Sequence, residues 1–125
     1  MTSIIDMKTR LAIEDLIHRH PWLIDHGQAD EITALFTEDA KLMGIGPDKA
    51  GRPAIAAWAD ARAALSDRRS RHVRSNIVLD EAGPGAVRGT MVLTLYRHDG
   101  PGEGSPAPSL IGEYADVYRK EADGA

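Results

Sequence analysis

The chain has 125 residues, of which 42% are hydrophobic and only 5% aromatic, so we expect a single domain over residues 1–125 with a mainly aliphatic core. Its formal net charge of -4 argues against nucleic-acid binding, since a phosphate backbone attracts basic surfaces. The sequence has no cysteine, which excludes disulfides and thiol chemistry, and no apolar run approaches the ~20 residues that cross a membrane. We therefore expect a soluble, cytoplasmic protein without a membrane partner.

The N-terminal segment has the spacing of an amphipathic helix. Apolar residues recur at helical intervals over residues 7–24. Pro21 lies inside this pattern and cannot donate a backbone hydrogen bond, so we expect a kink or a restart before Gly27 ends the helix. A straight helical wheel would place Asp25 off the apolar stripe, and the expected distortion makes the wheel unreliable for that residue.

Shorter elements are expected to follow. Residues 30–36 predict a short helix with Asp30 as its N-cap, and residues 40–43 predict a short strand. Pro53 suits the first turn of a helix that continues to about Leu65. We expect the basic cluster that follows to lie at the end of this helix, where cations complement the helix dipole; the cluster consists of Arg68, Arg69, Arg71 and Arg74.

The second half of the chain changes from helical to alternating periodicity. Strands are expected over residues 72–80, 86–96 and 110–118, with a loop rich in Gly, Pro and Ser over residues 99–108. In the first of these strands one face carries a mainly polar set that suggests a lined cavity: His72, Arg74, Asn76 and Val78. Helices followed by antiparallel strands indicate an α+β fold in which a curved, mostly antiparallel sheet wraps over the helices.

Several short segments, taken in order, resemble a known family. They are residues 11–16, 24–27, 34–40, 51–55 and 71–76, and together they resemble the SnoaL-like branch of the nuclear transport factor two-like superfamily. The resemblance extends over nearly the whole chain. It implies a cone-shaped α+β barrel with a deep apolar pocket, as in polyketide cyclases, scytalone dehydratase and a hexachlorocyclohexane dehydrochlorinase. Members usually end with a Trp-containing strand, whereas this sequence ends at Ala125, so we expect an uncovered sheet edge.

The resemblance also implies a catalytic pair. In the dehydratase and dehydrochlorinase members, an aspartate near the end of the first helix orients a histidine at the start of the strand after the third helix, and Asp25 and His72 fall on these positions. A buried carboxylate that accepts the Nδ1 proton of an imidazole fixes its tautomer and leaves Nε2 free to take a proton. Taken singly, His72 is also compatible with a strand-edge histidine, and Asp25 with a helix-end charge.

Further side chains are candidates for substrate binding. His20 lies in the apolar stripe of the first helix, Asn76 shares the expected face of His72, and Tyr114 lies on a strand that should cross the pocket. Weaker candidates, on the long strand and the first helix, are Tyr96, His98 and Trp22. His20 is also compatible with a satisfied core histidine, and Trp22 with packing. No set of residues has the spacing of a metal site, so neither a metal nor a cofactor is expected.

The resemblance and these residues together imply a cofactor-independent lyase or isomerase of dehydratase, dehydrohalogenase or cyclase type. His72 would remove a proton from a small apolar substrate, and Asp25 would orient the ring. Ketosteroid isomerase chemistry is disfavoured, because its base and oxyanion positions hold Gly44 and His20 here. The alternative is a non-catalytic module of the same fold that binds a small ligand or serves in an assembly. We expect a homodimer or a homotrimer, since a partner commonly covers the exposed sheet face in this superfamily.

Overall fold

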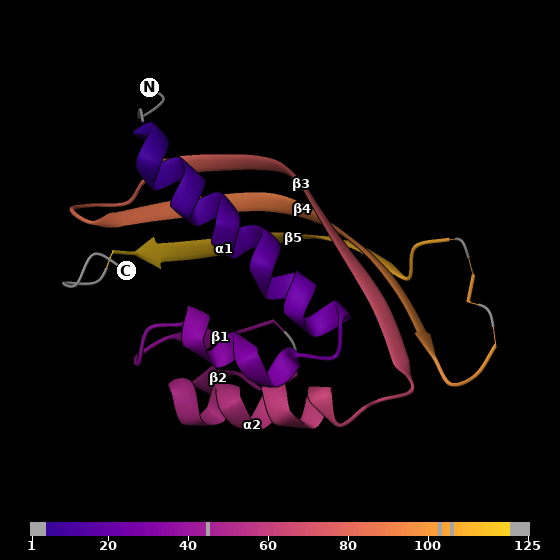
Figure 1. Ribbon diagram of the computed structural model, residues 1–125. Helices are drawn as coiled ribbons and strands as arrows, with labels where there is room; N and C mark the ends of the chain where they lie inside the picture. The colour runs from indigo at the N-terminus through magenta and orange to yellow at the C-terminus, as the bar shows by residue number, and fades with distance from the viewer. Residues whose placement is uncertain (1–4, 45, 103, 106, 121–125) are drawn as a thin grey trace.

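The computed structural model describes residues 5–44, 46–102, 104–105 and 107–120. In chain order the elements are α1 (Met7–Asp25), the 3₁₀ helix η1 (Ala29–Leu35), β1 (Lys41–Leu42), β2 (Lys49–Ala50), α2 (Arg52–Ala63), β3 (Arg68–Glu81), β4 (Ala86–Asp99) and β5 (Leu110–Arg119) (Figure 1). The expected order of helices first and long strands afterwards is confirmed. None of the helices in the described ranges is long and apolar enough to cross a membrane.

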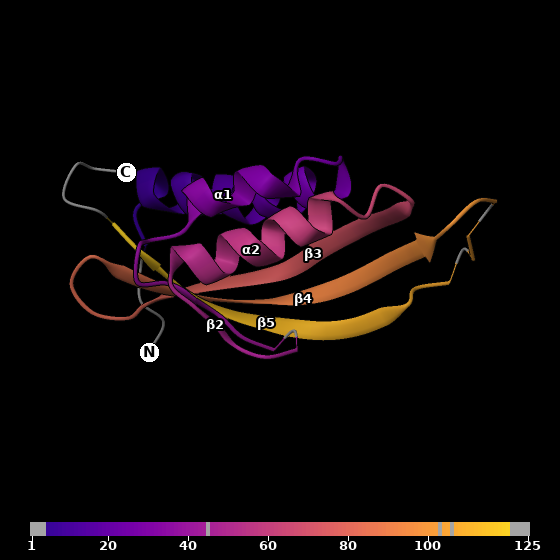
Figure 2. The same cartoon turned by 90° about the horizontal axis from the view of Figure 1, so that it is seen from below.

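The long antiparallel strands form an open sheet with the helices on one side. The order of this sheet is β3-β4-β5, and β1 and β2 form a separate two-stranded sheet. Figure 2 shows α1 and α2 on the same side of the curved long strands. The predicted α+β class with an antiparallel sheet is confirmed, but the described strands do not close into the expected barrel. Residues 121–125, on which the expected absence of a last strand depends, lie outside the described residues.

An N-cap and an apolar stripe account for α1. Asp6 accepts hydrogen bonds from the backbone N–H and the hydroxyl of Thr9, both at 2.9 Å, which satisfies a donor at the start of the helix. The buried residues of α1 follow helical spacing and are Ile13, Ile17, Pro21 and Ile24. The helix runs without a break through Pro21 to Asp25, so the expected restart is wrong.

Arg74 explains how α1 continues past Pro21. Proline has no N–H, so the carbonyl of Ile17, four residues earlier, loses its normal helical partner. Nη1 of Arg74 on β3 donates to that carbonyl at 3.1 Å. A buried carbonyl without a partner costs about 1–3 kcal/mol, so this contact offsets much of the penalty of the proline. The same contact ties the middle of α1 to the sheet.

Apolar clusters fix α1 at both ends. One cluster joins the first half of α1 to β3 and β4 and contains Ile13, Ile17, Leu79, Val87 and Met91. The other joins the end of α1 to η1 and α2 and contains Ile24, Ala29, Ile32 and Ala59. Aliphatic side chains dominate both clusters, as the low aromatic content predicts.

The short elements differ in detail from the prediction. η1 is a 3₁₀ helix whose N-cap is Gln28 rather than Asp30, and this cap makes no side-chain hydrogen bond. The strand expected over residues 40–43 is only Lys41–Leu42, and it pairs with β2, which the sequence does not predict. α2 lies within about two residues of its predicted ends.

The basic cluster lies on β3 rather than at the end of a helix. The strand begins at Arg68 and not at His72, so all four arginines of the cluster belong to it. Side chains alternate between the two faces of a strand, and the cluster is therefore divided. Arg68 pairs with Asp99 at 2.9 Å, whereas Arg74 turns inward to α1.

A β-bulge in β3 changes which residues face α1. The register with β4 shifts between Ser75 and Val78, and Asn76 adopts a left-handed φ of 54°. Asparagine tolerates this conformation better than most residues. The inward residues are Ser70, His72 and Arg74 before the bulge, and Ile77 and Leu79 after it. The predicted face is therefore right as far as Arg74 and wrong at Asn76, which is exposed.

Gly89 on β4 leaves room for an aromatic ring from the next strand. A Cβ atom at this position would lie 2.7 Å from Cε2 of Tyr118 and 3.2 Å from Cδ2 of Leu79. The Tyr118 hydroxyl donates to Asp116 at 3.1 Å, which limits movement of the ring. By contrast, a Cβ atom at Gly112 on β5 would meet nothing within 4 Å. Close packing therefore requires glycine at position 89 but not at position 112.

We expect Gly89→Ala to lower the free energy of unfolding by about 1–3 kcal/mol, because overpacking forces the Tyr118 ring to shift. Gly112→Ala is the matched control and should change this free energy by less than about 0.5 kcal/mol. Urea unfolding followed by circular dichroism measures both values. Equal effects of the two substitutions would contradict the packing role of Gly89.

Candidate active site

A histidine and an aspartate from different elements meet where α1 ends. Nδ1 of His72 on β3 lies 2.7 Å from Oδ1 of Asp25, the last residue of α1. The backbone N–H of His72 donates to the other carboxylate oxygen, Oδ2, at 2.8 Å. Both side chains are shielded from solvent, with 15% of the His72 side chain and 5% of the Asp25 side chain exposed. The two residues that the sequence suggests as a pair are therefore in direct contact.

The carboxylate of Asp25 is held in its charged form. Burial raises the pKa of Asp25, but hydrogen bonds from the His72 ring, the Ser70 hydroxyl and the His72 backbone outweigh it and lower the pKa below its usual value. An ionised carboxylate can only accept, so Nδ1 of His72 carries a proton, and in the neutral ring Nε2 then carries the lone pair. None of the hydrogen bonds among the described residues involves this Nε2. One ring nitrogen is thus able to take a proton from another molecule.

Ser70 and two arginines support Asp25. The buried hydroxyl of Ser70 donates to Oδ1 of Asp25 at 2.7 Å, and Arg62 of α2 donates to the same hydroxyl at 3.0 Å. Arg71 donates to the main-chain carbonyl of Asp25 at 3.2 Å. Ser70 lies two residues before His72 and so shares its face of the strand. These contacts connect α1, α2 and β3 through one carboxylate.

Ser70 and Arg62 are functional candidates that the sequence prediction missed, whereas Arg74 was predicted on the face of His72 but was given no contact of its own. The prediction starts the strand at His72, so Ser70 falls outside the alternating pattern, although β3 begins at Arg68. A strand extended by two residues would have placed Ser70 on the face of His72. Arg62 has no comparable signal, because Ser70, to which it donates, lies on another element and meets it only in the folded chain.

Two of the remaining candidates contact Arg74 close to the pair. Nη2 of Arg74 lies 3.0 Å from Nδ1 of His20, and the guanidinium carbon lies 4.4 Å from the ring centroid of Tyr114. His20 also meets the ring of Phe36 edge-on, with 5.6 Å between the centroids. Because Arg74 shares the inner face of β3 with His72, these side chains lie on the same side of the sheet as the pair.

Trp22 and Asn76 lie at the surface. Trp22 is 62% exposed and stacks on the ring of His26, with 4.0 Å between the centroids. Asn76 is exposed because the bulge turns it away from α1. Nothing in this geometry supports the expected role of either side chain in substrate binding.

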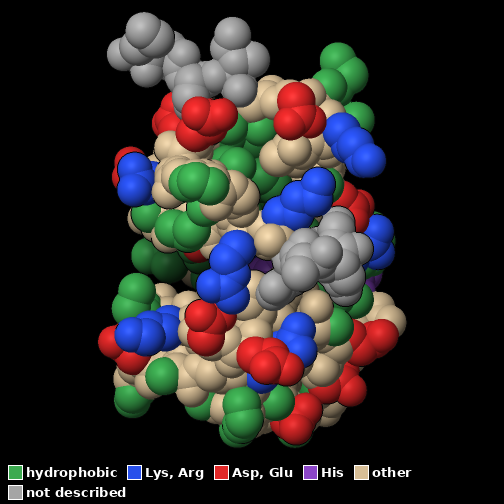
Figure 3. Space-filling view, turned by 90° about the vertical axis from the view of Figure 1, so that its left-hand side faces the viewer, with side chains coloured by type: hydrophobic (Ala, Val, Ile, Leu, Met, Phe, Trp, Pro, Cys, Tyr) green, Lys and Arg blue, Asp and Glu red, His purple; other side chains and the backbone are tan. Residues whose placement is uncertain are grey.

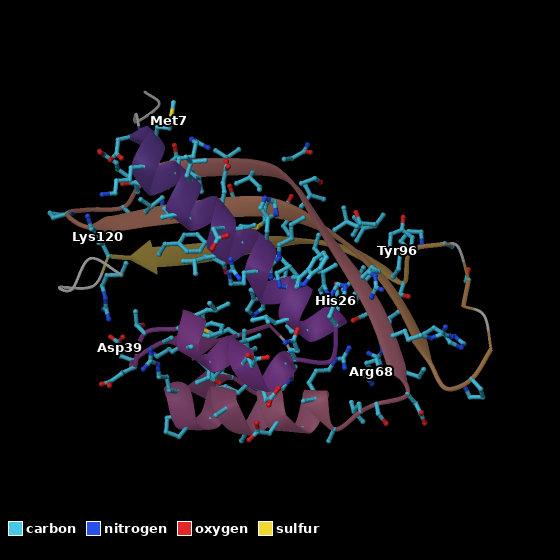
Figure 4. The ribbon with its side chains drawn as sticks, in the orientation of Figure 1. Met7, His26, Asp39, Arg68, Tyr96 and Lys120 are labelled. Atoms are coloured by element: carbon cyan, nitrogen blue, oxygen red, sulfur yellow. The ribbon has the colours of Figure 1, made fainter. Side chains whose placement is uncertain are left out.

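Tyr96 and His98 lie on the other face of the sheet. In the β3–β4 register they oppose Arg71 and Arg69, and directly opposed residues point to the same side. Since side chains alternate along a strand, both point away from the face that carries His72. Figure 4 shows Tyr96 beyond the end of α1. The geometry therefore separates both residues from the pair.

A cavity lies away from the pair, beside the first half of α1 and the turn between β3 and β4. Its volume is about 410 Å³, and its lining includes Ile13, Val87 and Tyr118. Neither Asp25 nor His72 lines it, so this cavity is not the deep pocket expected at the pair. On the face seen in Figure 3, acidic and basic side chains are interspersed and form no continuous basic surface.

The chemistry available at the pair is proton transfer. Nε2 of His72 can accept a proton, and the carboxylate of Asp25 stabilises the imidazolium that results. Within the described ranges, no three His, Asp or Glu side chains are grouped so that they could hold a metal ion.

Solved structures of other proteins share this fold. A protein from Catenulispora acidiphila in complex with S-DNPA is 20% identical, with a TM-score of 0.78 over 95% of this chain and 87% of that one. A protein from Novosphingobium aromaticivorans with the provisional name scytalone dehydratase is 23% identical, with a TM-score of 0.75 over 92% and 75% of the two chains. An NTF2-like protein with a cystatin-like fold from the same organism is 22% identical, with a TM-score of 0.73 over 98% and 85%. At these identities the likeness shows the fold alone.

The family is shown by the sequence itself. No curated protein sequence matches this chain. The model of the SnoaL-like domain, however, matches residues 6–124, which is nearly the whole chain. The NTF2-like fold of the structural neighbours agrees with this match. The resemblance expected from the short segments is confirmed, and the chain belongs to the SnoaL-like domain family.

Proposed function

We propose that this protein is a cofactor-independent lyase or isomerase in which Asp25 and His72 remove a proton from carbon in a small, largely apolar molecule. The observation that supports this most is the double contact of one carboxylate with one histidine, at 2.7 Å to the ring and 2.8 Å to the backbone N–H. Membership of the SnoaL-like family supports the same broad class, as does the neighbour that is provisionally named a scytalone dehydratase.

His72 is the general base in this proposal. Its Nε2 takes the proton, the ring becomes an imidazolium, and the charged carboxylate of Asp25 stabilises that cation at hydrogen-bond distance. Two atoms of His72 bind the two carboxylate oxygens, so the ring is oriented before the substrate arrives. Proton transfer by a positioned base contributes about 10²–10⁴-fold to a rate.

The electron pair left on carbon decides the reaction class. Expulsion of a leaving group from the neighbouring carbon gives a dehydratase or a dehydrohalogenase. Reprotonation at another carbon gives an isomerase, and attack on a carbonyl within the same molecule gives a cyclase. In each case the proton held by His72 is returned to the product or the leaving group, so no cofactor is consumed.

The alternative is a non-catalytic module that binds a small ligand or serves in an assembly. The observation that favours it is the position of the 410 Å³ cavity, beside Ile13 and Tyr118 rather than beside the pair. In that case the contact between Asp25 and His72 would serve only to join α1 to β3. Variants of the pair distinguish the two functions, because only the first function depends on the chemistry of the ring.

We expect His72→Gln and Asp25→Asn each to slow proton abstraction by about 100-fold or more, because one removes the base and the other removes the charge that orients it. His18→Gln changes an exposed histidine of α1 and is the matched control, which should keep full activity. The measurement is hydrogen–deuterium exchange at carbon in D₂O, followed by NMR, for a panel of cyclic ketones, β-diketones and halogenated cyclohexanes.

Circular dichroism establishes that the variants are folded before their rates are compared. Full exchange activity in a folded variant of either residue would contradict the mechanism. A panel on which the wild-type protein exchanges no proton would favour the non-catalytic module.

A further inference from the structure

The cavity beside the first half of α1 is separate from the pair of Asp25 and His72. Its lining comes from residues 5–16, from the turn between β3 and β4, and from the end of β5, which lie at one end of the molecule (Figure 1). Leu16 is the last residue of α1 that lines it, and Asp25 follows nine residues later, or about 14 Å along a helix. A molecule held by this lining therefore does not contact the pair.

The walls of the cavity are mainly apolar. Ile13 and Val87 belong to the buried cluster that joins α1 to the sheet, and Tyr118 packs against that cluster. The Tyr118 hydroxyl is already bound to Asp116, at 3.1 Å. The volume of about 410 Å³ lies in the range of small-molecule sites. An apolar cavity of about 150 Å³ can hold benzene, so this one has room for about two to three such rings.

Hydrogen-bonding groups of the lining are largely used within the protein. The backbone N–H and the hydroxyl of Thr9 both donate to Asp6, each at 2.9 Å. In the turn, the carbonyl of Gly85 accepts from the backbone N–H of Lys120 at 2.9 Å. A ligand would therefore gain little from strong donors or acceptors of its own, because most of its possible partners are already bound.

The charges of the lining balance one another. The charged side chains are two acids and three bases: Asp6, Glu81, Lys8, Arg119 and Lys120. Arg119 binds Asp39, which lies outside the lining, at 2.7 Å, and this leaves two lysines against two acids. The pKa of Asp6 is lowered, first by the hydrogen bonds from Thr9 and further by the charge of Lys120. A charged ligand would lose hydration here without meeting an uncompensated opposite charge.

We propose that this cavity is a binding site for a small, uncharged, apolar molecule, such as a hydrocarbon of two or three rings. Its affinity comes from apolar surface removed from water against Ile13, Leu16 and Val87. The inference does not rest on the proposed proton transfer, because neither Asp25 nor His72 takes part in it. It also gives a ligand class to the alternative, non-catalytic function.

Two fluorescent probes that differ by one charged group test the class of ligand. N-phenyl-1-naphthylamine is uncharged at neutral pH, and 8-anilino-1-naphthalenesulfonate is the same molecule with a sulfonate added. We expect saturable binding of the uncharged probe, seen as a rise in its fluorescence, and binding of the sulfonate that is weaker by about 10-fold or more. The absence of saturable binding of the uncharged probe, or equal or tighter binding of the sulfonate, would overturn the proposal.

NMR spectra of the methyl groups locate the bound probe in the wild-type protein. The resonances of Ile13, Leu16 and Val87 should shift as N-phenyl-1-naphthylamine is added, because these residues line the cavity. Those of Ile24 and Ile32, in the cluster at the other end of α1, should not shift. Shifts confined to the latter cluster, or to the exposed Ile111 on the outer face of the sheet, would place the probe elsewhere and contradict the site.

A charge introduced into the lining tests the same site by mutation. Ala12 lines the cavity and is exposed on α1, and Ala57 is an exposed alanine of α2 outside the lining. We expect Ala12→Asp to weaken binding of the uncharged probe by about 10-fold or more, because an apolar ligand would desolvate the new carboxylate. Ala57→Asp is the matched control and should bind as the wild type does.

Circular dichroism establishes that both variants are folded, and unchanged binding in folded Ala12→Asp would overturn the proposal. His72→Gln should bind the uncharged probe as the wild-type protein does. Exchange activity that survives in His72→Gln would therefore end the proposed function and leave the result for the cavity intact. Conversely, loss of probe binding in His72→Gln would contradict the separation of the two sites.

Discussion

The hydrogen bonds between Asp25 at the end of α1 and residues of β3 are the interaction on which both the fold and the proposed chemistry depend. The carboxylate of Asp25 accepts hydrogen bonds from the ring and the backbone N–H of His72 and from the hydroxyl of Ser70. These bonds keep a shielded carboxylate ionised, and the ionised carboxylate in turn requires the proton of His72 to be on Nδ1. One set of contacts thus positions the helix and leaves Nε2 available as a base.

The helix α1 continues past Pro21 to Asp25 because Arg74 supplies a hydrogen bond that the proline cannot make. Pro21 deprives the carbonyl of Ile17 of its helical donor, and Arg74 replaces that donor from the sheet. The other terminal nitrogen of Arg74, Nη2, donates to Nδ1 of His20. The residue that replaces the missing helical donor therefore also determines which nitrogen of the neutral His20 ring carries the proton. The side chain of Arg74 therefore contacts both the helix backbone at Ile17 and the ring of His20.

Periodicity and chain order were sufficient for the α+β class and the extent of α1, whereas the two members of the pair were identified from the family resemblance. Periodicity was insufficient at the β-bulge, where the alternation of side chains between the two faces of β3 is shifted. The left-handed φ of Asn76 turns its side chain away from α1, and alternation along a regular strand cannot predict this. The effect of Pro21 depends on Arg74, a residue of another element; local rules predicted a kink or a restart, and the helix does not restart. Tyr96 and His98 were misplaced because strand register, and not composition, decides their face.

The claim at the centre of this mechanism is that Asp25 holds His72 as the Nδ1–H tautomer and leaves Nε2 unprotonated. The ring ¹⁵N chemical shifts of His72, measured in the wild-type protein at a pH where imidazoles are neutral, report the tautomer directly. We predict a protonated Nδ1 and an Nε2 with the shift of an imidazole lone pair. A protonated Nε2, or averaged shifts from two exchanging tautomers, would contradict the mechanism.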